Sequence, residues 1–253
     1  MITVQEIAVA PIKSTALMRP AAVRVTERGI VEDRRFLVIN GDGRMVTGRE
    51  VGALTLVRAV YEPNPETLTL TLPDGRTARG PLKLGEPAEG LVFRSPFRGC
   101  VLAGEWNALL SDFCGHLLRI VRTDTPGQCV DIAPVSLLSE ASVQELNRRS
   151  AQNGAFESAR FRPNLLLSGC TPHEEDEWVG RRVRIGHDLV LSVTMRDSRC
   201  AQTNLNPSTG RNDADTMRAL ASYRREDGKV WFGIYASVER PGVVYVGDGV
   251  HVQ

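Results

Sequence analysis

The segment RRFLVINGDGRMVTGRE, residues 34–50, decides the fold class of this chain. At its centre, Asn40-Gly41-Asp42-Gly43 separates two short runs of apolar and β-branched residues. Because Asn and Gly tolerate the positive φ angles of tight turns, the segment predicts an antiparallel β-hairpin. Further along, LTLTLPDGRTARG (68–80) alternates strictly from Leu68 to Leu72 and then turns. Such alternation predicts a half-buried antiparallel strand, so the first hundred residues are expected to be mainly strands.

Helices are predicted only in the middle of the chain. In GEWNALLSDFCGHLLRIV (104–121), apolar residues recur at helical spacing, which predicts an amphipathic helix. These residues are Trp106, Leu109, Leu110, Phe113 and Leu117. A second helix is expected over SEASVQELNRR (139–149), with Ser139 as its N-cap. From Arg162 onward, short strand-like runs return without a repeat or a regular βαβ alternation. The chain is therefore expected to be mainly β (α+β), a barrel or sandwich and not a doubly wound sheet.

One segment has the composition of a domain junction. LGEPAEGLVFRSPFRG (84–99) is rich in Pro and Gly and has no clear hydrophobic period. We therefore expect a smaller β-rich domain over residues 1–95 and a β-barrel domain over residues 96–253.

Composition excludes several classes of protein. The 253 residues include 31 basic and 30 acidic side chains, a formal charge of +1, so no long-range attraction to nucleic acid or to an anionic membrane is expected. The N-terminal stretch does not resemble a signal peptide, and no apolar run approaches the roughly 18 residues of a membrane span. The five cysteines are scattered without a CxxC pair, which argues against a disulfide framework and a zinc ribbon. A cytoplasmic protein with reduced thiols is expected.

Cys200 is the cysteine whose sequence neighbours indicate a chemical role. In MRDSRCAQTNLNPSTG (195–210) it follows Ser198 and Arg199 and precedes a turn-rich segment. A neighbouring cation favours the thiolate, which is both a nucleophile and a ligand for soft transition metals. The other four cysteines are better interpreted as small buried apolar residues.

Three segments supply basic residues that could bind an anion. They are PIKS with Lys13 and Ser14, EDRRF with Arg34, and ARFRPN with Arg162 and Asn164. Each could instead be a solvated surface charge. Pro11 and Pro163 stiffen two of the segments, however, and a polar side chain on rigid backbone suits phosphate recognition. Three such sites and one thiol could together hold a phosphorylated cofactor through a metal.

These segments also carry a family resemblance that covers nearly the whole chain. The motifs, in order, are APIKS, GIVEDRRFLVINGDGRMVTGRE, PVSLLSEASVQELNRR, ARFRPNLLLSGC with EEDEWVG, SRCAQTNLNPSTG, LASYRR and FGIYASVERPGVVYVGD. The sequence resembles the MOSC family, named for the molybdenum-cofactor sulfurase C-terminal domain, with its N-terminal β-barrel companion. The amidoxime-reducing component enzymes are the members it resembles most.

The resemblance implies a molybdenum cofactor, with molybdopterin-bound metal, lying between the two domains. It implies that Cys200 ligates the metal and is the catalytic residue, and that Ser198 and Arg199 line the same pocket. The residues implied to contact the cofactor's phosphate or pterin are Lys13, Ser14, Arg34, Asp131, Arg162 and Asn164.

The chain departs from the family pattern at two places. Asn206-Pro207 stands where relatives have Asp-Pro, and Asp131-Ile132-Ala133 lacks the two hydroxyls of the family's Asp-Thr-Ser segment. The first departure puts a proton-donor role for position 206 in doubt. Water at the metal is the default proton source, with Asp213 or Asp215 as alternatives.

The implied activity is reduction of N-hydroxylated compounds such as amidoximes and hydroxylamines. Because the sequence has no cysteine cluster of an iron–sulfur domain, the electrons are expected from a separate reductase, ferredoxin-like or cytochrome-like protein. A second hypothesis is a sulfur or cofactor carrier that holds a persulfide on Cys200. A third, a binding module that has lost its cofactor, is disfavoured by the intact set of Lys13, Arg34, Arg162 and Cys200.

Overall fold

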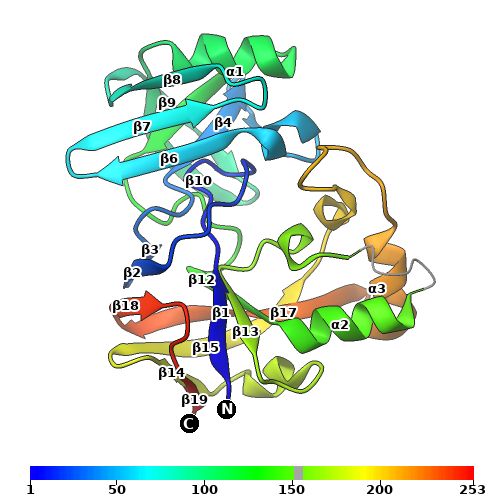
Figure 1. Ribbon diagram of the computed structural model, residues 1–253. Coiled ribbons are helices and arrows are strands. Elements are labelled where there is room, and N and C mark those ends of the chain that lie inside the picture. The colour runs from blue at the N-terminus through cyan, green and yellow to red at the C-terminus, as the bar shows by residue number, and fades with distance from the viewer. Residues whose placement is uncertain (151–155) are drawn as a thin grey trace.

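A computed structural model describes residues 1–150 and 156–253, which form two lobes with the chain termini side by side at the base of one of them (Figure 1). The lower lobe is a barrel-like sheet with β-strands in the order β1-β13-β12-β17-β15-β14-β19, and β16 pairs with β17. The bounds are β1 Thr3–Ile7, β12 Val135–Ser139, β13 Leu165–Ser168, β14 Arg182–Ile185, β15 Leu189–Ser198, β16 Arg225–Glu226, β17 Lys229–Arg240 and β19 Val250–Val252.

The two ends of this sheet approach each other and nearly close it. Thr3 of β1 forms a bridge with Gly249, just before β19, and the amide of Val4 donates to the Asp248 carbonyl at 2.9 Å. Leu and Val side chains fill the interior; Leu137, Leu167 and Leu191 are among those that are fully buried. The expected mainly-β barrel is confirmed.

The upper lobe contains two further sheets and one helix. A five-stranded sheet has the order β5-β4-β11-β10-β9, and β6, β7 and β8 form a three-stranded meander. The bounds are β4 Phe36–Asn40, β5 Met45–Val46, β6 Arg58–Pro63, β7 Glu66–Thr71, β8 Thr77–Pro81, β9 Leu84–Val92, β10 Ser95–Leu102, β11 Leu118–Thr123, α1 Trp106–Cys114 and the 3₁₀ turn η1 Gly52–Leu56. Leu68 and Leu70, the inward residues of the predicted strand, are fully buried in the core of this lobe.

The remaining elements surround the barrel. A small sheet joins β18 (Gly242–Tyr245), β2 (Ala22–Thr26) and β3 (Gly29–Ile30). Helices α2 (Glu140–Arg149) and α3 (Thr216–Arg224) pack with β17 through Leu146, Leu220 and Phe232. Short 3₁₀ turns complete the chain at η2 Ser158–Arg160, η3 Glu174–Trp178 and η4 Ala201–Asn204.

Several local predictions are confirmed. The Asn-Gly-Asp-Gly hairpin forms, with Val38 opposite Val46, and the Asn40 side chain accepts the amides of Asp42 and Arg44 at 3.0 Å each. Ser139 caps α2 by accepting the Ser142 amide at 3.1 Å. Of the five apolar residues expected in the first helix, Leu117 alone lies outside it. Gly115, with φ 68°, ends α1 before it, so Leu117 is 67% exposed.

Residues 84–99, which have the composition of a domain junction, form two strands and the turn between them. This segment forms the β9–β10 hairpin, and β10 pairs with β11, which pairs with β4. Pro87 is accommodated because β9 is an edge strand, where a missing amide donor is tolerated. Strand pairing therefore groups residues 96–123 with the N-terminal lobe, and the division at residue 95 stays a prediction.

The connection after β1 matters most for function. β1 pairs with β13 in the barrel, and then Ile12 bridges to Phe36 at the start of β4 in the other lobe. The intervening loop crosses from one lobe to the other and carries Lys13 and Ser14 into the junction. The loop between β3 and β4 carries Asp33 and Arg34 to the same place.

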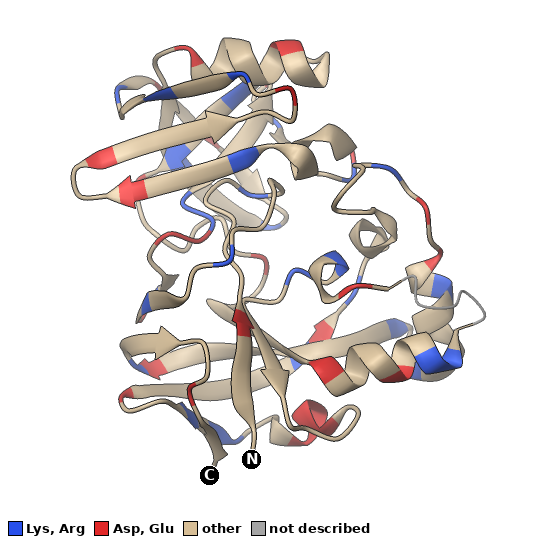
Figure 2. Ribbon diagram, viewed as in Figure 1, with Lys and Arg blue, Asp and Glu red and all other residues tan. Residues whose placement is uncertain are grey.

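Charge is distributed as the composition predicts. Basic and acidic residues are interspersed over both lobes in the view of Figure 2. Within the part of the chain that the structure describes, no helix is long and apolar enough to cross a membrane.

Candidate active site

A cavity of about 530 Å³ lies where the two lobes meet. Eight of the nine residues predicted from sequence line it: Lys13, Ser14, Arg34, Asp131, Arg162, Ser198, Arg199 and Cys200. They come from the loops after β1 and β3, the segment before β12, the turn before β13 and the end of β15. The predicted site residues are thus far apart in sequence but share one wall.

The buried Lys13 forms an ion pair with Asp131, whose side chain is partly exposed at the cavity. The Lys13 ammonium lies 2.7 Å from Asp131 Oδ1 and donates to the Cys129 carbonyl at 2.9 Å. Burial lowers the pKa of Lys13, although the carboxylate partly offsets it. Burial would raise the pKa of Asp131, but the charges of Lys13 and Arg34 hold it at about 2. Asp131 is therefore a fixed anion that orders the two cations.

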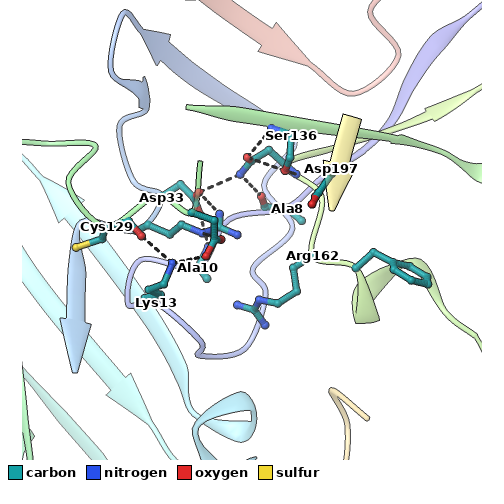
Figure 3. Close-up of polar contacts among 12 residues, drawn as sticks. Ala8, Ala10, Lys13, Asp33, Cys129, Ser136, Arg162 and Asp197 are labelled. Atoms are coloured by element: carbon teal, nitrogen blue, oxygen red, sulfur yellow. Dashed lines mark hydrogen bonds and ion pairs between the residues drawn. The ribbon is translucent and has the colours of Figure 1, made fainter. Parts of the chain in front are cut away.

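Arg34 pairs with Asp33, which is labelled in Figure 3, and Asp33 in turn accepts a hydrogen bond from Asn164. Asp33 pairs with the Arg34 guanidinium through Oδ2, and its Oδ1 accepts the Ala10 amide at 2.7 Å. Asn164 donates from Nδ2 to Asp33 Oδ2 at 2.9 Å and accepts the Ser136 amide at 3.1 Å. Burial lowers the pKa of Arg34, but the charges of Asp33 and Asp131 outweigh burial and raise it above its ordinary value.

Asn164 lies apart from the other predicted site residues, and its contact with the cofactor stays a prediction. It does not line the cavity, and its amide is committed to the backbone and to Asp33. Sequence reasoning missed Asp33, whose only signal was its position beside Arg34 in EDRRF.

Three cavity residues adopt left-handed backbone conformations, which residues other than Gly rarely adopt. The φ angles are 73° for Ser14, 46° for Arg34 and 52° for Arg162. Such a conformation costs roughly 1–2 kcal/mol per residue, and it persists only where the surroundings enforce it. Strain at three positions of one cavity wall is the pattern expected of a binding site.

Arg162 is a cation in need of a counter-ion. Its Nη2 donates to the Thr15 carbonyl at 2.7 Å, and among the described residues it has no ion pair with a carboxylate. Burial, and then the charge of Arg34, lower the pKa of Arg162 to about 10. An anion bound between the Arg34 and Arg162 guanidinium groups would offset both the burial of Arg162 and its repulsion by Arg34.

Arg199 is held rigidly while one of its amino groups has no partner. Its Nε donates to the Phe232 carbonyl at 2.7 Å and its Nη1 to the Phe161 carbonyl at 2.8 Å. Its Nη2 is buried and has no hydrogen-bond partner in the described chain. A Cβ at Gly233, where φ is 80°, would come within 3.1 Å of Nη2. Arg199 Nη2 is thus a preorganised hydrogen-bond donor for a ligand in the cavity.

Cys200 follows β15 directly and is exposed at the cavity, unlike the buried Cys129. The Thr203 amide and hydroxyl donate to the Cys200 carbonyl at 3.2 and 3.0 Å, which fixes the backbone that carries the thiol. In the described residues, no group of three or more His, Cys, Asp and Glu side chains could hold a metal ion. Any metal bound at Cys200 would therefore need further ligands from a cofactor.

The β9–β10 hairpin also lines the cavity, although its sequence had indicated only a domain junction. Its tip contributes Val92, Phe93, Arg94 and Ser95 to the cavity. The Phe93 ring lies 5.3 Å from the Lys13 ammonium and 5.5 Å from the Arg49 guanidinium, both within the range of a cation–π contact.

The proton donors considered from sequence lie elsewhere. Asp213 pairs with Arg160 at 2.7 Å, and Asp215 caps α3, a helix that the sequence reading did not include. Asn206 contacts Asp213 and accepts the Ser208 amide at 2.8 Å. None of these three residues lines the cavity, whereas Asp197, which sequence reasoning passed over, does.

Family models match both lobes of this chain. The model of the MOSC N-terminal β-barrel domain matches residues 1–116, and that of the MOSC domain matches residues 124–251. The chain belongs to the MOSC family. The mitochondrial amidoxime-reducing component 1 of Mus musculus is 31% identical over 287 aligned positions, which cover 99% of this chain and 82% of the relative. The human protein of the same name is 30% identical over 289 positions.

A longer relative and a solved structure also match this MOSC chain over most of its length. The molybdenum cofactor sulfurase of Oryza sativa is 26% identical, and the match covers 94% of this chain but 33% of that protein. The YUAD protein of Bacillus subtilis has a similar fold, with a TM-score of 0.50, 15% identity and coverage of 100% of this chain and 96% of that one.

Proposed function

We propose that this protein is a molybdenum-cofactor oxidoreductase that reduces N-hydroxylated compounds, such as amidoximes, with electrons from a separate redox protein. The observation that supports this most is the shared cavity, in which the exposed Cys200 thiol lies with several basic side chains, of which Arg162 has no carboxylate partner among the described residues. The names of the amidoxime-reducing relatives supply the reaction class.

The donor set fits a phosphorylated metal–pterin cofactor. Cys200 would supply a soft thiolate to the metal. Lys13, Arg34 and Arg162 would bind the anionic end, and the unpaired Nη2 of Arg199 would donate to an acceptor atom of the cofactor. The left-handed backbone at Ser14, Arg34 and Arg162 holds these groups ready before binding.

When bound, the cofactor would supply the two-electron redox chemistry. The chain's own residues bind it, fix its orientation and shape the route by which the substrate enters. Phe93 and Ile132, which are 47% and 53% exposed, provide apolar surface at the cavity for the organic part of a substrate. A separate redox protein would supply the electrons.

The test compares wild type, Cys200→Ala and the matched control Cys114→Ala, whose thiol is half-buried at the end of α1. Each is purified from cells able to make the cofactor. We expect molybdenum near one per chain, and amidoxime reduction by a reduced viologen dye, in wild type and the control. Both should be lost in Cys200→Ala.

Two results would contradict the proposal. Full molybdenum and full rate in Cys200→Ala would remove the thiol from the site. A persulfide on Cys200 in wild-type protein, without molybdenum and without reduction, would favour sulfur carriage instead.

A further inference from the structure

Asp197 is a buried carboxyl at the cavity wall that has no part in the cofactor-binding set above. It lies near the end of β15, three positions before Cys200, and is 3% exposed. Figure 3 shows it on the barrel side of the site, near Ser136. It is thus the carboxyl at this cavity that is not already committed to Lys13 or Arg34 through an ion pair.

One oxygen of this carboxyl is close to a cation but is not hydrogen-bonded to it. Asp197 Oδ2 lies 2.8 Å from Arg199 Nη1, yet Nη1 directs its hydrogen bond to the Phe161 carbonyl. Oδ2 has no hydrogen-bond partner among the described residues. An oxygen in this state can carry a proton and deliver it to a ligand in the cavity.

We propose that Asp197 is the acid that protonates the leaving oxygen of the N-hydroxylated substrate, an inference that rests on the proposed function. Two electrons, supplied in turn by the external redox protein, enter the N–O bond as it breaks. The oxygen keeps its own hydrogen, takes the proton from Asp197 Oδ2 and leaves as water. The nitrogen takes a second proton from solvent, which gives the amidine or amine, and Asp197 is then reprotonated from solvent.

The surroundings of Asp197 raise its pKa, so that it can hold this proton up to a pH of about 6. Burial raises its pKa to about 6, and the negative charge of Asp131 acts in the same direction. Arg199, the Tyr235 hydroxyl and Arg34 oppose the rise but do not cancel it. These groups come from the loops before β12 and β4, from β17 and from the residue that follows β15.

The first test follows the pH dependence of amidoxime reduction by a reduced viologen dye in the cofactor-loaded protein. Wild-type kcat should fall as pH rises above 6, because the acid form is lost. Asp197→Asn should lose about 100-fold or more of kcat, the usual contribution of a general acid, and the residual rate should no longer fall with pH. Asp42→Asn, in the exposed hairpin turn, should keep the wild-type rate and profile.

A purely structural role gives a different result. If Asp197 only positioned Arg199, its Asn variant would be slower but would keep the wild-type pH profile, and this would overturn the assignment. An unchanged rate in Asp197→Asn would overturn it as well.

The second test does not depend on activity. In cofactor-free protein, ¹³C NMR of the aspartate carboxyl carbons should show one resonance that titrates well above the ordinary Asp range and disappears in Asp197→Asn. If every aspartate titrates normally, the acid assignment is wrong while the proposed function stands. If cofactor-loaded wild type does not reduce amidoximes at all, the proposed function fails and takes this assignment with it.

Discussion

Replacing Asn164 with Ala tests whether this residue braces the site or touches the cofactor. The Asn164 side chain is 3% exposed and joins β12, the loop after β1 and Asp33. Its Oδ1 accepts the Ser136 amide at 3.1 Å and the Ser136 hydroxyl at 3.2 Å, and its Nδ2 donates to Asp33 Oδ2 at 2.9 Å. A longer contact reaches the Ala8 carbonyl at 3.4 Å.

The expected loss follows from these bonds. Each neutral hydrogen bond is worth about 1 kcal/mol and the one to the charged Asp33 about 2 kcal/mol, so Asn164→Ala should lower the free energy of unfolding by about 4 kcal/mol. Much of this loss arises because the Ser136 amide would stay buried without its partner and Asp33 Oδ2 would lose one of its two donors.

Urea unfolding of the cofactor-free protein, followed by circular dichroism, measures this directly. Asn212→Ala is the matched control, because Asn212 is exposed, and its effect should stay within about 0.5 kcal/mol. A loss below about 1 kcal/mol in Asn164→Ala, combined with loss of bound cofactor, would show that Asn164 does not stabilise the site from behind. It would favour a direct contact between Asn164 and the cofactor.

Two more predictions concern the same cavity. The folded-state pKa of Asp197 is raised from 3.8 to about 6, so the folded protein binds more protons than the unfolded chain between these values. Wild type should therefore lose about 2 kcal/mol of stability relative to Asp197→Asn as pH rises from 4 to 7. Parallel urea titrations at both pH values check this, and an equal difference at the two would contradict it. Gly233→Ala forces a side chain to φ 80° and to within 2.8 Å of the Leu137 carbonyl and 3.1 Å of Arg199 Nη2, so a loss of roughly 1–3 kcal/mol and weaker cofactor retention are expected. Unchanged unfolding and unchanged molybdenum content would contradict that reasoning.

Local patterns in the sequence determined the elements that depend on near neighbours. The Asn-Gly-Asp-Gly turn, the alternation of Leu68 and Leu70 and the Ser139 cap act over a few residues, and the structure has all three. Eight of the residues that the family motifs marked also line the cavity.

The strands at residues 84–99 could not be predicted from local pattern. Pro87 removes an amide donor, which an edge strand tolerates, and the sequence does not show that β9 lies at the edge of a sheet. The role of its tip as a cavity wall likewise depends on packing against the other lobe.

The sequence by itself determined the strand-rich fold, the thiol and the cations. Only the tertiary structure decided which carboxyl faces which cation. Asp33 and Asp197 are both ordinary acidic residues in the chain, yet one is consumed by Arg34 and Asn164 while the other keeps a free oxygen at the cavity. The physical reason is that burial and electrostatic pairing depend on groups brought together from distant segments, and these set both the charge of a carboxyl and its availability for chemistry.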